Sequence, residues 1–260
     1  MRYKVTLAYV GTAYAGFQSQ INARTIQDEI ERALLTIFRK PVRIVSASRT
    51  DQGVHAYGQV FHFDAPEKDP RKLKYSLNGL LPGDIHINAV EPVSEEFHAR
   101  YQVRAKTYAY LINNGERDVF YEKRAFQCHY DLDYAKMEEC CELFVGTHDF
   151  GSFNTSTYEE HPDQVRTIYV CRLVRRGDRL VLLFKGSGFL RHMVRIMTGM
   201  IFEVGRGKKT VAEVREFLEH PCKSKRRYNI DPSGLYLLKI DYMNEEDYRL
   251  KKERYLYGER

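Results

Sequence analysis

The stretch Ser48-Arg49-Thr50-Asp51-Gln52-Gly53-Val54-His55-Ala56 lies between two segments with strand patterns. Residues 42–45 are largely apolar, and apolar and polar residues alternate again over 59–63. A polar loop with glycine between two strands is a place where rigid scaffolds present reactive groups. Asp51 and Gly53 are equally typical of an ordinary turn, in which the carboxylate bonds its own backbone and Arg49 is solvated.

The first part of the chain combines strand and helix patterns. Thr25 is expected to cap a helix, because Asp28 follows it at the spacing of a capping box. The helix itself is indicated by an apolar stripe at helical spacing, made of Ile26, Ile30, Leu34 and Ile37. A shorter helix is expected over 70–80, and strands over 3–8, 42–47, 59–63 and 85–90.

The second part repeats this order. Strands are expected over 108–112, 167–174, 180–184 and 235–240, and helices over 134–144, 189–204 and 211–218. Arg176-Gly177-Asp178-Arg179 is a plausible hairpin turn. The pattern predicts an α+β fold of two similar halves with largely antiparallel sheets. We expect these at 1–104 and 105–245, with 246–260 as a charged tail, either helical or partly disordered.

Composition narrows the class of protein. The chain has 260 residues, of which 43% are hydrophobic, so it can bury a substantial core. No apolar run approaches the roughly 18 residues needed to span a bilayer. The start lacks an apolar signal region, and we therefore expect a cytoplasmic protein without a membrane partner. Five cysteines, an odd number, argue against a disulfide scaffold.

A metal site is not expected. Cys128, His129, Cys140 and Cys171 are the conceivable zinc ligands, but they lack the spacing of known zinc motifs.

The charge balance is mildly basic, with 41 basic against 35 acidic residues and a formal net charge of +6. Positive charge concentrates at 172–179 and 223–227, and the chain contains 19 tyrosines. Basic residues mixed with aromatic ones suit a nucleic-acid surface. The same residues also suit ordinary solvation and the packing of half-buried strands.

Several motifs, taken together, resemble those of the TruA-type tRNA pseudouridine synthases. The catalytic loop of that family is similar to Arg-Thr-Asp-x-Gly-Val-His at 49–55. Its other motifs are similar to Tyr9–Gln18, Leu81–Ile85, Phe97–Tyr101, Lys106–Tyr110, Gly146–Phe150, Phe189–Arg195 and Gly234–Leu237. These segments occur in the family's order and cover nearly the whole chain.

The resemblance implies a pseudouridine synthase fold, in which the two halves flank a central basic cleft that binds RNA. It implies isomerisation of uridine to pseudouridine in tRNA, and we expect positions 38–40 of the anticodon stem-loop as the target. The reaction requires no cofactor, and family members work as homodimers. Asp51 is the implied nucleophile toward a flipped uridine. Attack on the sugar, addition to the base and removal of a sugar proton all remain open.

Arg195 is the implied partner of Asp51. A guanidinium keeps a desolvated carboxylate ionised. The segment 189–204 also supports this interpretation, because it is almost wholly apolar except for Arg191 and Arg195, and a buried arginine requires a carboxylate partner. The alternatives are a structural ion pair and a phosphate contact.

The resemblance also assigns substrate contacts. Arg49 is expected to help extrude the target nucleotide and to contact the RNA backbone. Tyr108 is expected to stack on the uracil, although two tyrosines on one strand are usually core residues. Leu235 is expected to pack against the base, and it too has the simpler reading of a core residue. His55 is expected to fix the loop as a hydrogen-bond donor or to contact RNA.

Two residues beside Asp51 differ from the family pattern. The family usually has Gly where Ser48 stands and a small residue where Gln52 stands. We expect the chemistry to survive, because Arg49, Thr50, Asp51 and Gly53 are intact. The rival hypotheses are the same chemistry on ribosomal RNA and a non-catalytic RNA-binding or remodelling protein.

Overall fold

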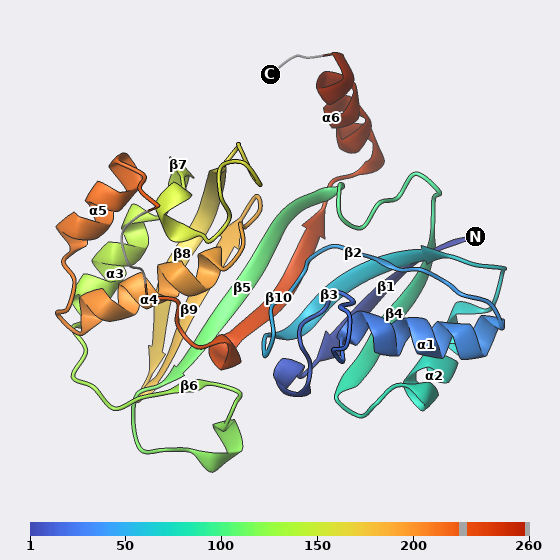
Figure 1. The fold of residues 1–260 in the computed structure, drawn as a ribbon, viewed down its shortest axis with the longest axis horizontal. Coiled ribbons are helices and arrows are strands. Elements are labelled where there is room, and N and C mark those ends of the chain that lie inside the picture. Colours follow the sequence, from blue (N-terminus) through green and yellow to red (C-terminus); the bar gives the residue numbers. More distant parts are fainter. Residues whose placement is uncertain (224–227, 258–260) are drawn as a thin grey trace. The chain divides into compact units, whose positions relative to one another are not determined.

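The computed structural model describes residues 1–223 and 228–257 (Figure 1). The chain forms two compact units, one of Met1–Ala105 with the chain from Leu237 onward, and one of Lys106–Tyr236. The first break lies one residue from the expected one. Most of the final strand, from Leu237 onward, belongs to the first unit, whereas the predicted division placed the whole strand in the second half.

The first unit is built on a sheet in which the strands have the order β4-β1-β3-β10, with β2 beside β3. Their bounds are β1 Arg2–Tyr9, β2 Val45–Ser46, β3 His55–Asp64, β4 Ile85–Val93 and β10 Leu235–Tyr242. β1 pairs antiparallel with both β3 and β4. Every second residue of β1 is buried, from Tyr3 to Tyr9, so one face of the strand contributes to the core.

Two amphipathic helices complete this core. They are α1, Ile26–Phe38, and α2, Pro70–Leu80. The predicted cap of α1 is confirmed, because Thr25 Oγ1 accepts the backbone N–H of Asp28 at 3.2 Å. Asp69 caps α2 in the same way, and Pro70 takes the first helical position, where its missing N–H is not needed.

The strand predicted over 42–47 is shorter in the structure: Val45 and Ser46 pair with β3, and the backbone N–H of Ala47 donates to the carbonyl oxygen of Val60 at 2.8 Å. The reason lies in α1: the backbone N–H of Ile44 donates to Glu31 Oε1 at 3.2 Å, so it bonds a helix side chain. The charged tail forms a helix, α6, Glu245–Tyr257. Residues 258–260 lie outside the described residues.

The second unit has a sheet of strand order β5-β9-β8-β7, with β6 beside β5. The bounds are β5 Val103–Asn113, β6 Phe126–Gln127, β7 Gly146–Asp149, β8 Val165–Arg176 and β9 Arg179–Gly186. All these pairs are antiparallel except β5 with β6. The predicted hairpin turn is confirmed, because Arg176 pairs with Arg179 and Gly177 has a φ of 58°.

The described residues of this unit form three α-helices: α3 Tyr134–Leu143, α4 Met193–Gly205 and α5 Val211–Glu219. α4 was predicted to begin at Phe189, which is wrong. His192 has a φ of 60°, in the left-handed region, and the helix starts after it. Arg191 therefore precedes the helix and does not share a helical stripe with Arg195.

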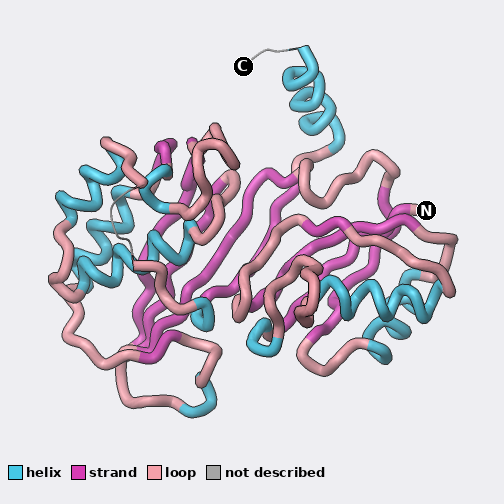
Figure 2. The backbone as a smooth tube through the Cα atoms, in the orientation of Figure 1, coloured by secondary structure: helices cyan, strands magenta, loops and turns pink. Residues whose placement is uncertain are grey.

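Each unit thus combines a mostly antiparallel sheet with helices, as Figure 2 shows, and the predicted α+β class is confirmed. Short 3-10 turns occur at Gly11–Ala13 (η1), Val119–Tyr121 (η2), Gly151–Phe153 (η3) and Pro232–Gly234 (η4). Within the described residues, none of the helices has the length and apolar character that a membrane span requires.

Candidate active site

The loop that carries Asp51 joins β2 to β3 and ends in a tight turn. The backbone N–H of Val54 donates to the carbonyl oxygen of Asp51 at 3.2 Å. Gly53, the third residue of this turn, has a φ of 78°. That value is typical of a type II turn, where the third position requires a positive φ. The glycine two residues after Asp51 is therefore a conformational requirement of the loop.

Side chains alternate across this loop. Ser48 and Thr50 are 6% and 8% exposed, so they point into the unit. Arg49 and Gln52 are exposed, and Asp51 is half-buried between them. In the part of the chain that the structure describes, Arg49 forms no ion pair, so its guanidinium is available to a phosphate. The longer side chain at Gln52 is accommodated because it lies in solvent.

The segment that follows β1 holds the backbone of the Asp51 loop in place through a hydrogen bond. The backbone N–H of Phe17 donates to the carbonyl oxygen of Thr50 at 3.0 Å. Gly16, the residue before Phe17, has a φ of 114°. A Cβ at Gly16 would lie 2.9 Å from the carbonyl oxygen of Thr50. The glycine of the Tyr9–Gln18 motif thus permits a close approach of two backbones.

His55 is buried, 1% exposed, at the first position of β3. Its Nδ1 accepts the backbone N–H of Gly11 at 3.0 Å. The imidazole of His55 therefore accepts a hydrogen bond at Nδ1, whereas it was expected from the sequence to donate one. Its burial supports the loop-fixing hypothesis over a direct contact with RNA.

Tyr108 lies on β5 of the second unit. Tyr108 and Tyr110 face the same side of the strand, opposite Phe184 and Leu182 of β9. Tyr108 is 7% exposed, and its ring meets that of Phe189 edge to face, with 5.2 Å between the centroids. Tyr110 is wholly buried, and its hydroxyl donates to the carbonyl oxygen of Asp231 at 2.5 Å. Tyr110 is thus a core residue.

Arg195 lies in the first turn of α4 and is half-buried. Its Nε donates to the carbonyl oxygen of Ile230 at 2.8 Å, which orients the guanidinium. Leu235 begins β10 and is 5% exposed. Just before it, a Cβ on Gly234 would come within 2.6 Å of the carbonyl oxygen of Leu111. The start of β10 therefore lies directly against β5.

The predicted site residues fall into two groups. Arg49 and Asp51 lie in one loop of the first unit and His55 begins the strand after it, whereas Tyr108, Arg195 and Leu235 belong to the second unit. The pairing of Asp51 with Arg195 stays a prediction. Sequence reasoning missed the buried polar residues beneath the loop, above all Gln59. Its signal was an amide side chain inside the apolar strand pattern of 59–63.

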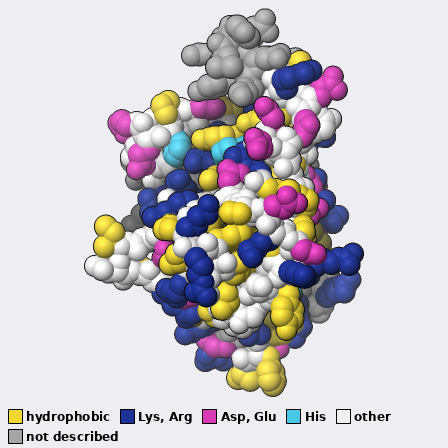
Figure 3. Space-filling model, turned by 90° about the vertical axis from the view of Figure 1, so that its right-hand side faces the viewer, with side chains coloured by type: hydrophobic (Ala, Val, Ile, Leu, Met, Phe, Trp, Pro, Cys, Tyr) yellow, Lys and Arg dark blue, Asp and Glu magenta, His cyan; other side chains and the backbone are white. Residues whose placement is uncertain are grey.

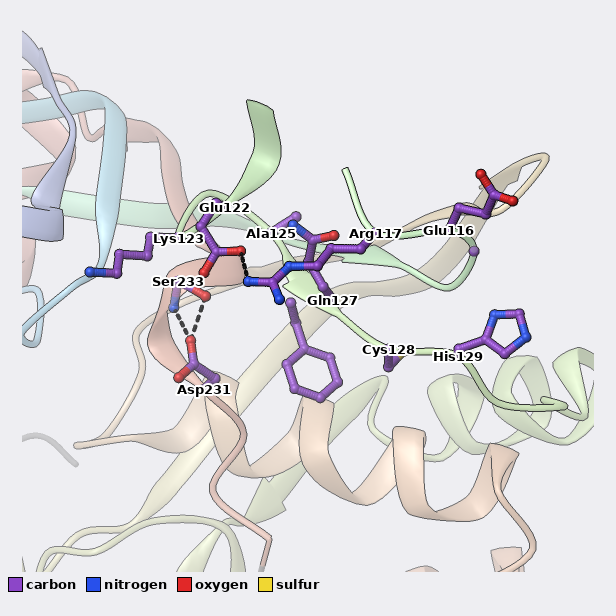
Figure 4. Close-up of a pocket in the computed structure, with 12 residues that line it drawn as sticks. Glu116, Arg117, Glu122, Lys123, Ala125, Gln127, Cys128, His129, Asp231 and Ser233 are labelled. Carbon is purple, nitrogen blue, oxygen red and sulfur yellow. Dashed lines mark hydrogen bonds and ion pairs between the residues drawn. The ribbon is translucent and has the colours of Figure 1, made fainter. Parts of the chain in front are cut away.

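The second unit also contains an open pocket of about 710 Å³, drawn in Figure 4. It lies between the loop at 115–129 and residues 231–233, and none of the predicted site residues lines it. Three of its charged side chains already have partners within the protein. Arg117 forms an ion pair with Glu122 at 2.9 Å, and Asp231 accepts the backbone N–H of Ser233 at 2.8 Å. The pocket is therefore not assigned to the chemistry.

Thiol and metal chemistry gain no support from the side chains. Cys140, Cys141 and Cys171 are buried, and burial raises the pKa of Cys140 and of Cys171 well above the ordinary value, which disfavours a reactive thiolate. Burial also raises the pKa of Cys128, to about 11. Among the described residues, no three of His, Cys, Asp and Glu are grouped to hold a metal ion.

Basic side chains are numerous on one face of the molecule. Figure 3 shows Lys and Arg side chains distributed among apolar ones over the face that it presents. Some of the basic residues at 172–179 already interact with other side chains of the protein. Arg179 forms an ion pair with Asp118 at 3.0 Å, and the guanidinium of Arg175 lies 4.5 Å from the centre of the Tyr134 ring. In the other predicted basic cluster, residues 224–227 lie outside the described residues.

Comparison with known families matches this chain to the family model described as tRNA pseudouridine synthase, over residues 6–102 and 140–243. The first matched segment contains the whole Asp51 loop with its bracing turn. The second contains Arg195 and Leu235. The chain belongs to the tRNA pseudouridine synthase family.

Individual relatives agree with the family match over nearly the full length. The chain is 42% identical over 245 residues to tRNA pseudouridine synthase A of Anoxybacillus flavithermus, covering 94% of this chain and 99% of the relative. It is 43% identical over 242 residues to the protein of the same name from an Exiguobacterium species, covering 93% and 98%. The Bacillus licheniformis protein of that name is 42% identical over 248 residues, covering 94% and 100%.

Proposed function

We propose that this protein isomerises uridine to pseudouridine in tRNA, with Asp51 as the nucleophile. The observation that carries the proposal is the Asp51 turn, which presents a half-exposed carboxylate near the exposed Arg49. A backbone hydrogen bond from Phe17 to Thr50 holds this turn in place. Family membership supplies the reaction, and the names of the relatives support tRNA as the substrate.

The isomerisation breaks the bond between C1′ of the ribose and N1 of the uracil and forms one between C1′ and C5. The C5 hydrogen leaves as a proton and N1 gains one, so neither an oxidant nor a cofactor is required. A carboxylate can stabilise or trap the sugar while the base turns, as in glycosidases. Arg195 is the proposed guanidinium partner of Asp51, and Tyr108 and Leu235 are the proposed contacts to the base.

The target uridine lies in a stem and must be flipped out, at a cost of a few kcal/mol. Contacts between basic side chains and phosphates offset that cost. Arg49 is suited to this role because its side chain is exposed next to Asp51. We propose positions 38–40 of the anticodon stem-loop as the target, with a homodimer in the cytoplasm as the working form. These finer assignments rest on the resemblance.

The substrate is tested by incubating the protein with unmodified tRNA and ribosomal RNA transcripts and mapping pseudouridine by carbodiimide-dependent primer extension. Modification at 38–40 of tRNA is the expected result. Modification confined to ribosomal RNA would retain the chemistry and replace the substrate. Tight RNA binding without any pseudouridine would favour the binding protein over the enzyme. Light scattering of the free protein tests the proposed dimer.

A further inference from the structure

A chain of buried polar side chains lies beneath the loop that carries Asp51. Gln59, on β3, is wholly buried. Its Nε2 donates to the carbonyl oxygen of Ser48 at 2.8 Å and to the hydroxyl of Tyr9 at 3.4 Å. Tyr9, the last residue of β1, shares a hydrogen bond of 2.7 Å with Thr50 Oγ1. β1 and β3 are thereby hydrogen-bonded to Ser48 and Thr50, two residues of the loop whose side chains are buried.

The amide of Gln59 can take only one orientation in this network. Its Oε1 accepts the backbone N–H of Val60 at 3.1 Å, so the nitrogen must face the loop. A buried polar group requires such partners, because an unpaired one costs its full desolvation. A well-packed apolar residue at this position of β3 would avoid that cost. The specific benefit of glutamine is thus the geometry that it imposes on residues 48–50.

We propose that Gln59 and Tyr9 are positioning residues for the isomerisation, which set the direction of the Asp51 carboxylate through Ser48 and Thr50. This inference rests on the proposed function. Ser48 and Thr50 flank Arg49 and lead directly into Asp51, so any shift of this backbone moves the carboxylate. Reacting groups must be held to within about 0.5 Å. A misplacement of about 1 Å can slow a reaction by about a hundredfold.

The variants follow from the individual bonds. Gln59→Leu removes the hydrogen bonds that Nε2 donates to Ser48 and Tyr9, and we expect a fall in kcat of about 10- to 100-fold. Tyr9→Phe removes only the bridge to Thr50, and we expect a smaller fall in kcat. Thr50→Ser keeps the hydroxyl and should retain most of the rate, whereas Thr50→Val removes it and should resemble Tyr9→Phe. In each case the fall should appear mainly in kcat, with a smaller change in tRNA affinity, because the long, exposed side chain of Arg49 can still reach a phosphate when its backbone shifts slightly.

Gln102 provides a matched control. It is also a buried glutamine of the first unit, 2% exposed, and its Oε1 accepts the backbone N–H of His98 at 3.2 Å. Gln102→Leu therefore removes a comparable buried amide that serves another loop. Both variants should lower the melting temperature, but only Gln59→Leu should lower kcat per folded molecule. Equal kcat values for the two variants, corrected for the folded fraction, would overturn the proposal.

Hydrogen exchange separates this inference from the proposed function. Peptides that cover 48–54 are followed by mass spectrometry in wild type and Gln59→Leu, alongside tritium release from tRNA labelled at uridine C5. We expect faster exchange in the loop together with slower release. Unchanged exchange with wild-type release would overturn the positioning role. Faster exchange in a protein whose wild type releases no tritium would refute the proposed function and reduce Gln59 to a structural residue.

Discussion

Nδ1 of His55 accepts the backbone N–H of Gly11 over 3.0 Å and thereby joins the end of the Asp51 loop to the turn after β1. The approach is close: a Cβ on Gly11 would lie 2.0 Å from the carbonyl oxygen of Val54. The hydrogen bond and a backbone contact that only glycine permits therefore both hold the turn against the loop.

Gly11→Ala should destabilise the protein and disturb the loop. The added methyl must displace backbone, and overpacking of this kind costs about 3 kcal/mol. Urea denaturation measures the loss, and tritium release measures the effect on the reaction. Gly79→Ala is the control, because a Cβ there meets nothing within 4 Å and alanine favours the α2 helix. Similar stability of the two variants would contradict the close contact.

Gly53→Ala should slow the reaction by straining the turn. A positive φ costs an alanine about 1–2 kcal/mol. Gly177 is the matched control, since it has a φ of 58° in the β8–β9 hairpin and a Cβ there meets nothing within 4 Å. Both alanine variants should lose similar stability in denaturant, but only Gly53→Ala should lower kcat. An equal kcat in the two variants would show that the Gly53 turn does not position Asp51.

Arg49→Ala should weaken tRNA binding and reduce its dependence on salt. If the exposed guanidinium contacts one phosphate, its loss lowers the slope of log K against log salt concentration by about one. Filter binding across a salt series provides the measurement. Gln52→Ala is the control, because it shortens an equally exposed neighbour without changing charge. An unchanged slope for Arg49→Ala would remove Arg49 from the RNA-binding surface.

His62 should make the protein less stable in mild acid. Burial lowers its pKa from 6.5 to about 4, helped by the positive charges of His98 and Arg2, while Asp64 acts in the opposite direction. Between these two pH values the unfolded chain binds a proton that the folded protein does not. The contribution of neutral His62 to the free energy of unfolding is therefore fully present above pH 6.5 and is lost as the pH drops toward 4.

The melting temperature of His62→Gln should depend less on pH over this interval than that of wild type. Glutamine keeps an oxygen that can accept the backbone N–H of Ala99, which donates to His62 Nδ1 at 3.2 Å. His86→Gln serves as the control, because His86 is exposed on β4. If wild type and His62→Gln show parallel pH profiles, His62 does not carry the effect.

Local signals in the sequence were sufficient for several elements. The bounds of α2 are those expected, since Pro70 marks the start and Leu73 and Leu77 form the buried stripe. The Thr25 cap likewise placed the start of α1. Asp51 and Gly53 were sufficient to predict a turn at this position, and the resemblance of the motifs to the family indicated that the loop carries the reactive group.

Other features depend on distant parts of the chain. β3 begins four residues earlier than expected because His55 and Ala56 are both buried, which hides the alternation of a strand. α4 begins late because His192 adopts a left-handed conformation that its apolar neighbours do not reveal. The role of Gln59 appears only when β1 and β3 bring Tyr9 and Ser48 to its amide.

The most direct test of the central claim is tritium release from tRNA labelled at uridine C5, comparing wild type with Asp51→Ala without any added cofactor. Formation of pseudouridine must expel that hydrogen into water. We expect release by wild type and none by Asp51→Ala, with both proteins folded and binding tRNA. Release by the variant at the wild-type rate would contradict the assignment of Asp51 as the nucleophile.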